Sequence, residues 1–219
     1  MPLVVAMDGP SGSGKSSAAK GVARTLGLRY LDTGAMYRAI TWWMLQQDID
    51  VEDGAAVAAR AVQPTLVSGT DPGAPTISVD GVDVSGPIRT PEVTGAVSAV
   101  SRVPEVRARL VELQREIIGD GEIVVEGRDI GTVVAPDAPV KVYLTASEEA
   151  RAMRRAKELS ADQAATLLDQ ARRDRLDSTR KTSPLTKADD AVEIDSTELG
   201  LDEVIDAVVR LVKERAATG

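Results

Sequence analysis

Gly9-Pro10-Ser11-Gly12-Ser13-Gly14-Lys15-Ser16 is the stretch of this 219-residue sequence that decides its fold. It satisfies the pattern G-x-x-x-x-G-K-[ST]. The apolar run Leu3–Asp8 before it predicts a buried strand, and Lys15 to Leu26 after it has the pattern of a helix. A strand, a glycine-rich turn and a helix in this order predict a phosphate-binding loop, or P-loop.

The residue types in this loop suit a nucleoside triphosphate. Glycines let backbone N–H groups turn toward a β-phosphate, and the following helix adds the partial positive charge of its N-terminus. We expect Lys15 to bridge the β- and γ-phosphate oxygens and Ser16 to offer its hydroxyl to Mg²⁺. The sequence therefore predicts an ATP or GTP site whose P-loop residues are Gly9, Pro10, Ser11, Gly12, Ser13, Gly14, Lys15, Ser16 and Ser17.

Short apolar runs and helical patterns alternate along the rest of the chain. The runs that predict further strands are Arg29–Leu31, Ile123–Val125, Val140–Leu144 and Val192–Ile194. The segments with helical patterns are Gly34–Gln47, Thr90–Val100, Val103–Ile118, one from Ser147 onward, one from about Asp162 to Thr179, and Leu201–Arg215. This alternation predicts an α/β three-layer fold, in which helices cover both faces of a five-stranded parallel sheet.

Residues 64–89 have a different character. Thr76–Val84 alternates between polar and β-branched residues, and Asp80-Gly81 within it is a signal for a tight hairpin. The segment also holds Pro64, Pro72, Pro75 and Pro87. We therefore expect a small antiparallel β insert here rather than another strand of the parallel sheet.

The composition limits the catalytic groups and metal sites that this chain can contain. The chain has no Cys and no His, which excludes disulfides, thiol nucleophiles and imidazole bases and makes a zinc site unexpected. Catalysis must use carboxylates, Lys, Arg, hydroxyls, backbone amides or a bound metal ion. No apolar stretch approaches the length of a membrane span, and the N-terminus shows no secretory leader pattern. We expect a cytoplasmic protein without a membrane partner.

Charge is distributed unevenly. The net charge of −8 argues against a nucleic-acid partner. Between Arg151 and Lys187, however, ten basic and five acidic residues leave an excess of five positive charges. This basic segment is compatible with a polyanionic ligand held locally, and equally with a solvated helical face.

A possible metal ligand ends one of the predicted strands. Ile123–Gly127 is an apolar run that carries Glu126 near its end, a position at which a carboxylate can hold Mg²⁺ through water. An acidic residue at a strand end is also common as a turn or cap residue. Ser16 and Glu126 are thus the predicted metal site.

Several arginines lie where turns of the chain meet the carboxyl edge of the predicted sheet, at which open α/β folds bind ligands. They are Arg38, Arg128, Arg173 and Arg180. Guanidinium forks match the oxygens of a phosphate. One such arginine is usually part of a surface ion pair, but several together with a P-loop predict a second, phosphate-bearing substrate.

Asp32–Arg38 (D-T-G-A-M-Y-R) and Glu126–Val134 (E-G-R-D-I-G-T-V-V) resemble the corresponding segments of bacterial cytidylate kinases. Other segments similar to this family are Val79–Ser85, Ile88-Arg89, Pro136–Lys141, Ser183–Leu185 and Asp189–Ala191. These matches follow the family's order and span almost the whole chain. The resemblance implies a phosphotransferase of pyrimidine nucleotide metabolism, which uses ATP and Mg²⁺ to convert CMP or dCMP into CDP or dCDP.

The resemblance also implies roles for residues. Lys15, Arg128 and Arg180 would be catalytic, and Arg151 and Arg155 would join the ATP site. The implied CMP-binding residues are Thr33, Tyr37, Arg38, Ser98, Arg107, Arg128, Asp129, Arg173, Asp177 and Arg180. Among them Ser98, Arg107 and Asp129 would read cytosine, whose N4 amino group suits a carboxylate. Thr33 and Glu126 stand where the family often has Ser and Asp, and both keep the functional group.

Three regions are expected on the same basis. The P-loop core would comprise residues 1–35, 100–149 and 185–219. Residues 36–99, with the β insert, would bind the nucleoside monophosphate. Residues 150–184 would form a mobile helical lid, and nothing in the sequence demands more than a monomer.

Three other functions compete with this one. Another small P-loop kinase would act on UMP, AMP, dTMP or a metabolite such as shikimate, but the insert and the Gly127–Thr132 segment argue against it. A GTPase switch needs an N-K-x-D-like segment, which the sequence lacks. A P-loop binding module without transfer chemistry would have little use for Lys15, Ser16 and the arginine set.

Overall fold

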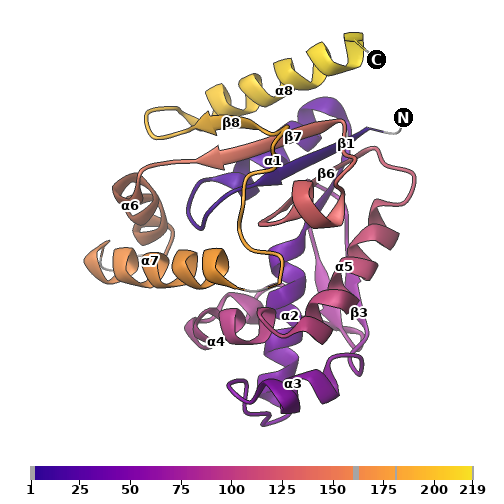
Figure 1. Ribbon diagram of the computed structural model, residues 1–219, viewed down its shortest axis with the longest axis vertical. Coiled ribbons are helices and arrows are strands. Elements are labelled where there is room, and N and C mark those ends of the chain that lie inside the picture. Colours follow the sequence, from indigo (N-terminus) through magenta and orange to yellow (C-terminus); the bar gives the residue numbers. More distant parts are fainter. Residues whose placement is uncertain (1–2, 160–162, 181, 219) are drawn as a thin grey trace.

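A five-stranded parallel sheet runs through the centre of the computed structural model, which describes residues 3–159, 163–180 and 182–218 (Figure 1). Its strands are β1 (Val4–Asp8), β2 (Arg29–Asp32), β6 (Ile123–Gly127), β7 (Val140–Thr145) and β8 (Val192–Asp195). They lie in the order β2-β6-β1-β7-β8, which places β1 at the centre of the sheet, with β2 and β6 on one side of it and β7 and β8 on the other. This arrangement confirms the predicted fold, and it places the loop after β1 at the middle of the sheet edge.

Helices cover both faces of the sheet because the central strands β1 and β6 are apolar on both sides. Along β1, Val4 and Ala6 join one core cluster, while Val5 and Met7 join the other. Helices α1 (Lys15–Leu26) and α8 (Leu201–Thr218) pack on the Val5 side. Helices α2 (Thr33–Gln46) and α5 (Pro104–Ile118) pack on the opposite side. The absence of Phe and the scarcity of other aromatic residues leave Ala, Val, Leu, Ile and Met to fill these cores.

The predicted antiparallel insert is a three-stranded sheet of β3 (Leu66–Ser68), β4 (Ile77–Val79) and β5 (Val82–Asp83). Its hairpin turns at Asp80 and Gly81, whose φ values of 50° and 80° are those of a two-residue turn with left-handed backbone. The loop after β3 also touches the main sheet, because the Tyr30 N–H donates to the Thr70 carbonyl at 2.9 Å. The insert therefore covers the free edge of β2.

Short helices surround the insert. Helix α3 (Gly54–Arg60), which the sequence reading missed, is capped by Asp53 through the backbone amides of Ala55 and Ala56. A 3₁₀ turn, η1 (Pro87–Arg89), leads into α4 (Pro91–Ser101). The predictions for the segments that became α4 and α5 differ from the observed bounds by at most one residue.

The turn after β6 is held by the end of β1. Asp8 is buried, and its two carboxylate oxygens accept from the backbone amides of Ile130, at 2.9 Å, and Gly131, at 2.8 Å. These amides begin an irregular helical turn, η2 (Ile130–Val134). Burial raises the pKa of Asp8 to about 6, although the two amide hydrogen bonds oppose this shift. The anchor fixes the backbone just after Arg128 and Asp129.

Two helices, α6 (Glu148–Leu159) and α7 (Gln163–Thr179), lie where the strands end, opposite both chain termini (Figure 1). They form the main part of the predicted lid, whose mobility remains a prediction, as do the boundaries of the three regions. Asp162, the predicted start of the second helix, lies outside the described residues. Across the described ranges, we find no helix with the length and apolarity needed to cross a membrane.

Candidate active site

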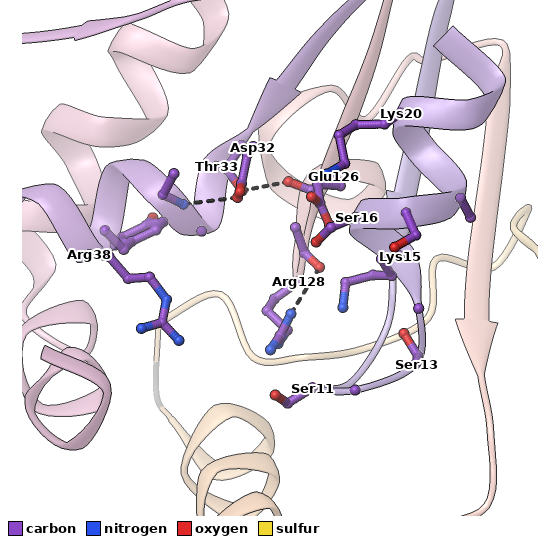
Figure 2. A pocket seen from close by; sticks show the side chains of 18 of the residues that line it. Ser11, Ser13, Lys15, Ser16, Lys20, Asp32, Thr33, Arg38, Glu126 and Arg128 are labelled. Atoms are coloured by element: carbon purple, nitrogen blue, oxygen red, sulfur yellow. Dashed lines mark hydrogen bonds between the residues drawn. The ribbon is translucent and has the colours of Figure 1, made fainter. Parts of the chain in front are cut away.

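One cavity of about 850 Å³ lies at the carboxyl edge of the sheet and is lined by the P-loop together with the arginines (Figure 2). It brings together nearly all of the predicted site residues, although Gly9, Pro10 and Arg151 do not line it. Those that do are Ser11, Gly12, Ser13, Gly14, Lys15, Ser16, Ser17, Thr33, Tyr37, Arg38, Ser98, Arg107, Glu126, Arg128, Asp129, Arg155, Arg173, Asp177 and Arg180.

The P-loop wraps around the ammonium group of Lys15. The Lys15 Nζ donates to the Pro10 carbonyl at 2.8 Å, and Gly14 precedes α1 with a φ of 89°. Among the described residues no side chain caps α1, which leaves N–H groups at its start available to an anion. Burial and the nearby charge of Arg128 lower the pKa of Lys15 to about 7, while Glu126 and Asp8 oppose that shift. Phosphate oxygens would favour the charged ammonium form.

Close packing restricts two other loop positions. A Cβ at Gly9 would lie 2.0 Å from the Leu144 carbonyl oxygen, because the loop starts against β7. A Cβ at Gly12 would lie 2.3 Å from the Gln170 Nε2 of α7. The P-loop is thus in direct contact with β7 on one side and with α7 on the other.

A hydroxyl and a carboxylate meet at the start of α1. The Ser16 Oγ donates to the Glu126 Oε2 at 2.9 Å, and Glu126 is buried at the end of β6 (Figure 2). Burial and the neighbouring charge of Asp32 raise the pKa of Glu126. Oxygen donors beside a phosphate-binding loop suit Mg²⁺, which usually keeps several waters and binds few protein ligands. The described residues contain no group of three or more acidic side chains placed to hold a metal.

An ion pair lies deep in the other half of the cavity. The Arg107 Nη2 donates to the Asp129 Oδ2, and the two side chains are 2% and 6% exposed. The guanidinium also donates to the Ser101 carbonyl and lies 5.2 Å from the centre of the Tyr37 ring. Within the described ranges the buried Nε of Arg107 makes no hydrogen bond, which leaves a donor for a ligand.

Three further arginines gather between this pair and the P-loop. The Arg38 Nη1 donates to the Thr94 Oγ1 at 2.9 Å, and the Arg128 Nε donates to the Asp177 Oδ2 at 3.1 Å. Arg180 lies 3.7 Å from Asp177 and 3.9 Å from Asp129. So many cations in a buried space repel one another, and an anionic ligand would relieve that repulsion.

The pKa values of these arginines reflect the crowding. Burial and the charges of Arg173 and Arg155 lower the pKa of Arg38 to about 9. Burial and the charge of Arg107 likewise lower the pKa of Arg180. The Nη2 of Arg180 is buried and makes no hydrogen bond within the part of the chain that the structure describes.

Arg151 has a different position from the one expected. Its Nη1 donates to the Ser11 carbonyl at 3.0 Å and to Asp174, and Asp174 accepts from the Ser11 amide at 3.2 Å. Arg151 thus joins α6, α7 and the P-loop instead of lining the cavity. The sequence did not identify Asp174 as a site residue, although it lies three residues before Asp177 on the same helix. Other cavity-lining residues that the predictions did not include are, among others, Lys20, Tyr30, Asp32, Arg89 and Arg154.

The family model described as "Cytidylate kinase" matches residues 5–214. Three relatives that carry the name "Cytidylate kinase" are similar over nearly their full length. One from Streptomyces coelicolor is 64% identical, and one from Streptomyces avermitilis is 62% identical, each over 98% of this chain and 94% of the relative. One from Nocardia farcinica is 56% identical over 100% of this chain and 97% of its own.

Two solved structures share the fold. An uncharacterized protein from Eubacterium ventriosum has a TM-score of 0.56 at 13% identity, with 98% of this chain and 99% of that chain covered. A sugar kinase from Janibacter has a TM-score of 0.50 at 15% identity, with 97% and 95% covered. At such low identity these likenesses concern the fold alone.

Proposed function

Because the chain belongs to the cytidylate kinase family, we propose that it transfers the γ-phosphoryl group of ATP to CMP or dCMP, forming ADP and CDP or dCDP. The observation that carries the proposal is the single cavity lined by both the P-loop and the buried Arg107–Asp129 pair. It offers a triphosphate site and a selective polar site within one cavity.

The transfer is an in-line displacement. An oxygen of the CMP phosphate attacks the γ-phosphorus of ATP, and the bond from that phosphorus to the β–γ bridging oxygen breaks, so ADP leaves with this oxygen. A phosphate dianion is already a nucleophile and needs no general base, which suits a chain without His. Lys15 neutralises charge on the β- and γ-phosphates, while Arg38, Arg128 and Arg180 hold the acceptor phosphate.

The Arg107–Asp129 pair and Ser98 select the base. The Asp129 carboxylate accepts from the N4 amino group of cytosine, while Arg107 and Ser98 donate to its acceptor atoms. Uracil would place a carbonyl oxygen against Asp129 and leave both groups unpaired. Thr33 and Tyr37 complete the CMP contacts, and Arg173 and Asp177 meet the sugar hydroxyls.

Mg²⁺ is the metal that Ser16 and Glu126 fit, with the hydroxyl as a ligand and the carboxylate acting through water. When bound with ATP, it neutralises charge that develops on the transferring phosphoryl group. Arg155, which lines the cavity from α6, completes the ATP site. Arg151 supports this site through the P-loop carbonyl that it binds. We propose that the protein is cytoplasmic, where its nucleotide substrates are found. We also propose that it acts as a monomer, because one chain supplies both the P-loop and the acceptor residues of this cavity.

A coupled ADP-release assay with MgATP tests the proposal against CMP, dCMP, UMP, AMP, GMP and dTMP. We expect fast turnover with CMP and dCMP. Arg38→Ala should abolish most of it, while Arg102→Ala, which breaks a surface pair with Glu52, should retain it. A preference for another monophosphate would contradict the base-reading roles, and no turnover with any of them would contradict the acceptor class.

A further inference from the structure

Tyr30 lies in the second position of β2, with its ring packed in the core beneath α1. The residue is 1% exposed and shares this core with Ala19 and Val124. Its backbone is fixed as well, because its N–H donates to the Thr70 carbonyl of the insert. Ring and backbone therefore leave the phenol little freedom.

The phenol reaches the predicted metal ligand. The Tyr30 hydroxyl donates to the Glu126 Oε1, while the Ser16 Oγ donates to the Oε2 at 2.9 Å. The Glu126 carbonyl also accepts from the Thr33 Oγ1 at 2.7 Å. Burial and the charges of Glu126 and Asp32 raise the pKa of Tyr30, so the phenol stays protonated and remains a donor.

We propose that Tyr30 is a positioning residue of the metal site, whose phenol holds the Glu126 carboxylate toward Ser16 and the bound metal–nucleotide. This inference rests on the proposed function, since it takes Ser16 and Glu126 as the Mg²⁺ residues. Glutamate has three side-chain torsions, and a buried carboxylate without a fixed donor can turn toward other cations. Lys15 is such a cation, since its charge acts on Glu126. Tyr30 prevents that rearrangement.

The alternative is that Tyr30 only fills space beneath α1. Phenylalanine would then serve as well, because it keeps the ring and removes only the hydroxyl. Tyr30→Phe therefore separates the two roles. Tyr143→Phe is the matched control, since Tyr143 lies on β7, is half-buried and does not line the cavity.

Binding of Mn²⁺ to the enzyme–ADP complex, followed by the electron paramagnetic resonance signal of free Mn²⁺, tests the proposal without turnover. We expect the dissociation constant for Mn²⁺ to rise about three- to tenfold in Tyr30→Phe, as for loss of a partner that orients a metal ligand. Binding of ADP without metal should not change. Tyr143→Phe should bind Mn²⁺ like the wild type.

A double-mutant cycle with Glu126→Gln decides whether Tyr30 acts through Glu126. Glu126→Gln alone should weaken Mn²⁺ binding, and adding Tyr30→Phe should weaken it no further. Unchanged binding in Tyr30→Phe, or an equal loss in both backgrounds, would overturn the role of Tyr30 and leave the metal site intact. Unchanged binding in Glu126→Gln would instead overturn the proposed metal site itself, and with it this inference.

Discussion

The two halves of the cavity are built in different ways. The half that faces ATP takes most of its groups from one continuous segment, Ser11 to Ser17, whose geometry is set by main-chain conformation. The acceptor half takes side chains from α2, α4, α5, α7 and the turn after β6. Asp129 and Asp177 lie among its arginines, and the nearby Asp174 accepts a hydrogen bond from the P-loop amide of Ser11.

Because the two halves are built differently, substitutions in one half should affect other properties than substitutions in the other. A site made of backbone is independent of most side chains, so changes there should affect transfer and leave acceptor recognition intact. A site made of buried ion pairs carries stability and selectivity in the same residues, because breaking a pair leaves an uncompensated charge. Four experiments test this division, in order of decreasing expected effect.

Lys15→Ala should separate the halves most strongly. Loss of the ammonium group removes charge neutralisation at the transferred phosphoryl group, and we expect kcat to fall by at least about a thousandfold. CMP binding, measured by calorimetry, should change by less than about threefold, because Lys15 acts on the transition state of the transfer and not on the bound CMP. Lys187→Ala, at a surface pair with Glu193, is the control. Loss of CMP binding together with kcat would contradict the division.

Asp129→Asn should change selectivity and stability together. The amide can donate to a uracil carbonyl, so kcat/KM for CMP should fall about 10- to 100-fold while the ratio of UMP to CMP turnover rises. Arg107 would remain buried without its carboxylate, and we expect the free energy of unfolding to fall by about 3 kcal/mol. Chemical denaturation measures this loss. Asp190→Asn, the control, removes a largely exposed partner of Lys141 and should leave selectivity as it is. An unaltered UMP to CMP ratio in Asp129→Asn would argue against base reading by the Arg107–Asp129 pair.

Gly12→Ala and Gly14→Ala form a matched pair within the P-loop. Both positions have positive φ, at 77° and 89°, so both substitutions strain the backbone by about 1–2 kcal/mol. Among the described residues, only the Gly12 Cβ would collide with α6 and α7, 2.3 Å from the Gln170 Nε2 and 2.9 Å from the Arg151 carbonyl oxygen, while no residue beyond its chain neighbours lies within 4 Å of the Gly14 Cβ. Limited proteolysis should therefore cleave residues 150–180 faster in Gly12→Ala than in Gly14→Ala. Equal cleavage would show that the contact with Gln170 does not hold the lid.

Asp8→Asn should have the smallest effect, and one that depends on pH. The pKa of Asp8 is raised in the folded state, so its contribution to stability is present at low pH and is lost as the pH rises through about 6. Asparagine does not titrate. The stability of the wild type relative to the variant should thus fall by about 2 kcal/mol between about pH 4.5 and about pH 8. Urea denaturation across this range measures the difference, and a pH-independent difference would refute the assigned shift.

The same division explains which parts of the fold and of the site could be predicted from the sequence. The P-loop was predictable because all its groups are adjacent in the chain, and the five strands because each is a short apolar run between turn signals. Helix α3 was missed because its seven residues, rich in alanine, show little periodicity. The position of Arg151 and the contacts of Asp174 and Tyr30 depend on pairings across more than 20 residues, which no local pattern encodes.

The hydrogen bond from the Tyr30 amide to the Thr70 carbonyl has a consequence for the protein in a crowded cell. A strand at the border of a sheet can recruit a strand from a second chain and begin aggregation. At one border of this sheet, the Tyr30 N–H already donates a hydrogen bond to the insert. At the other border, β8 is only four residues long and carries the charged residues Glu193 and Asp195. A shortened protein that lacks residues 64–85 would expose the border at β2. We therefore regard the insert as a guard against self-association as well as a wall of the cavity.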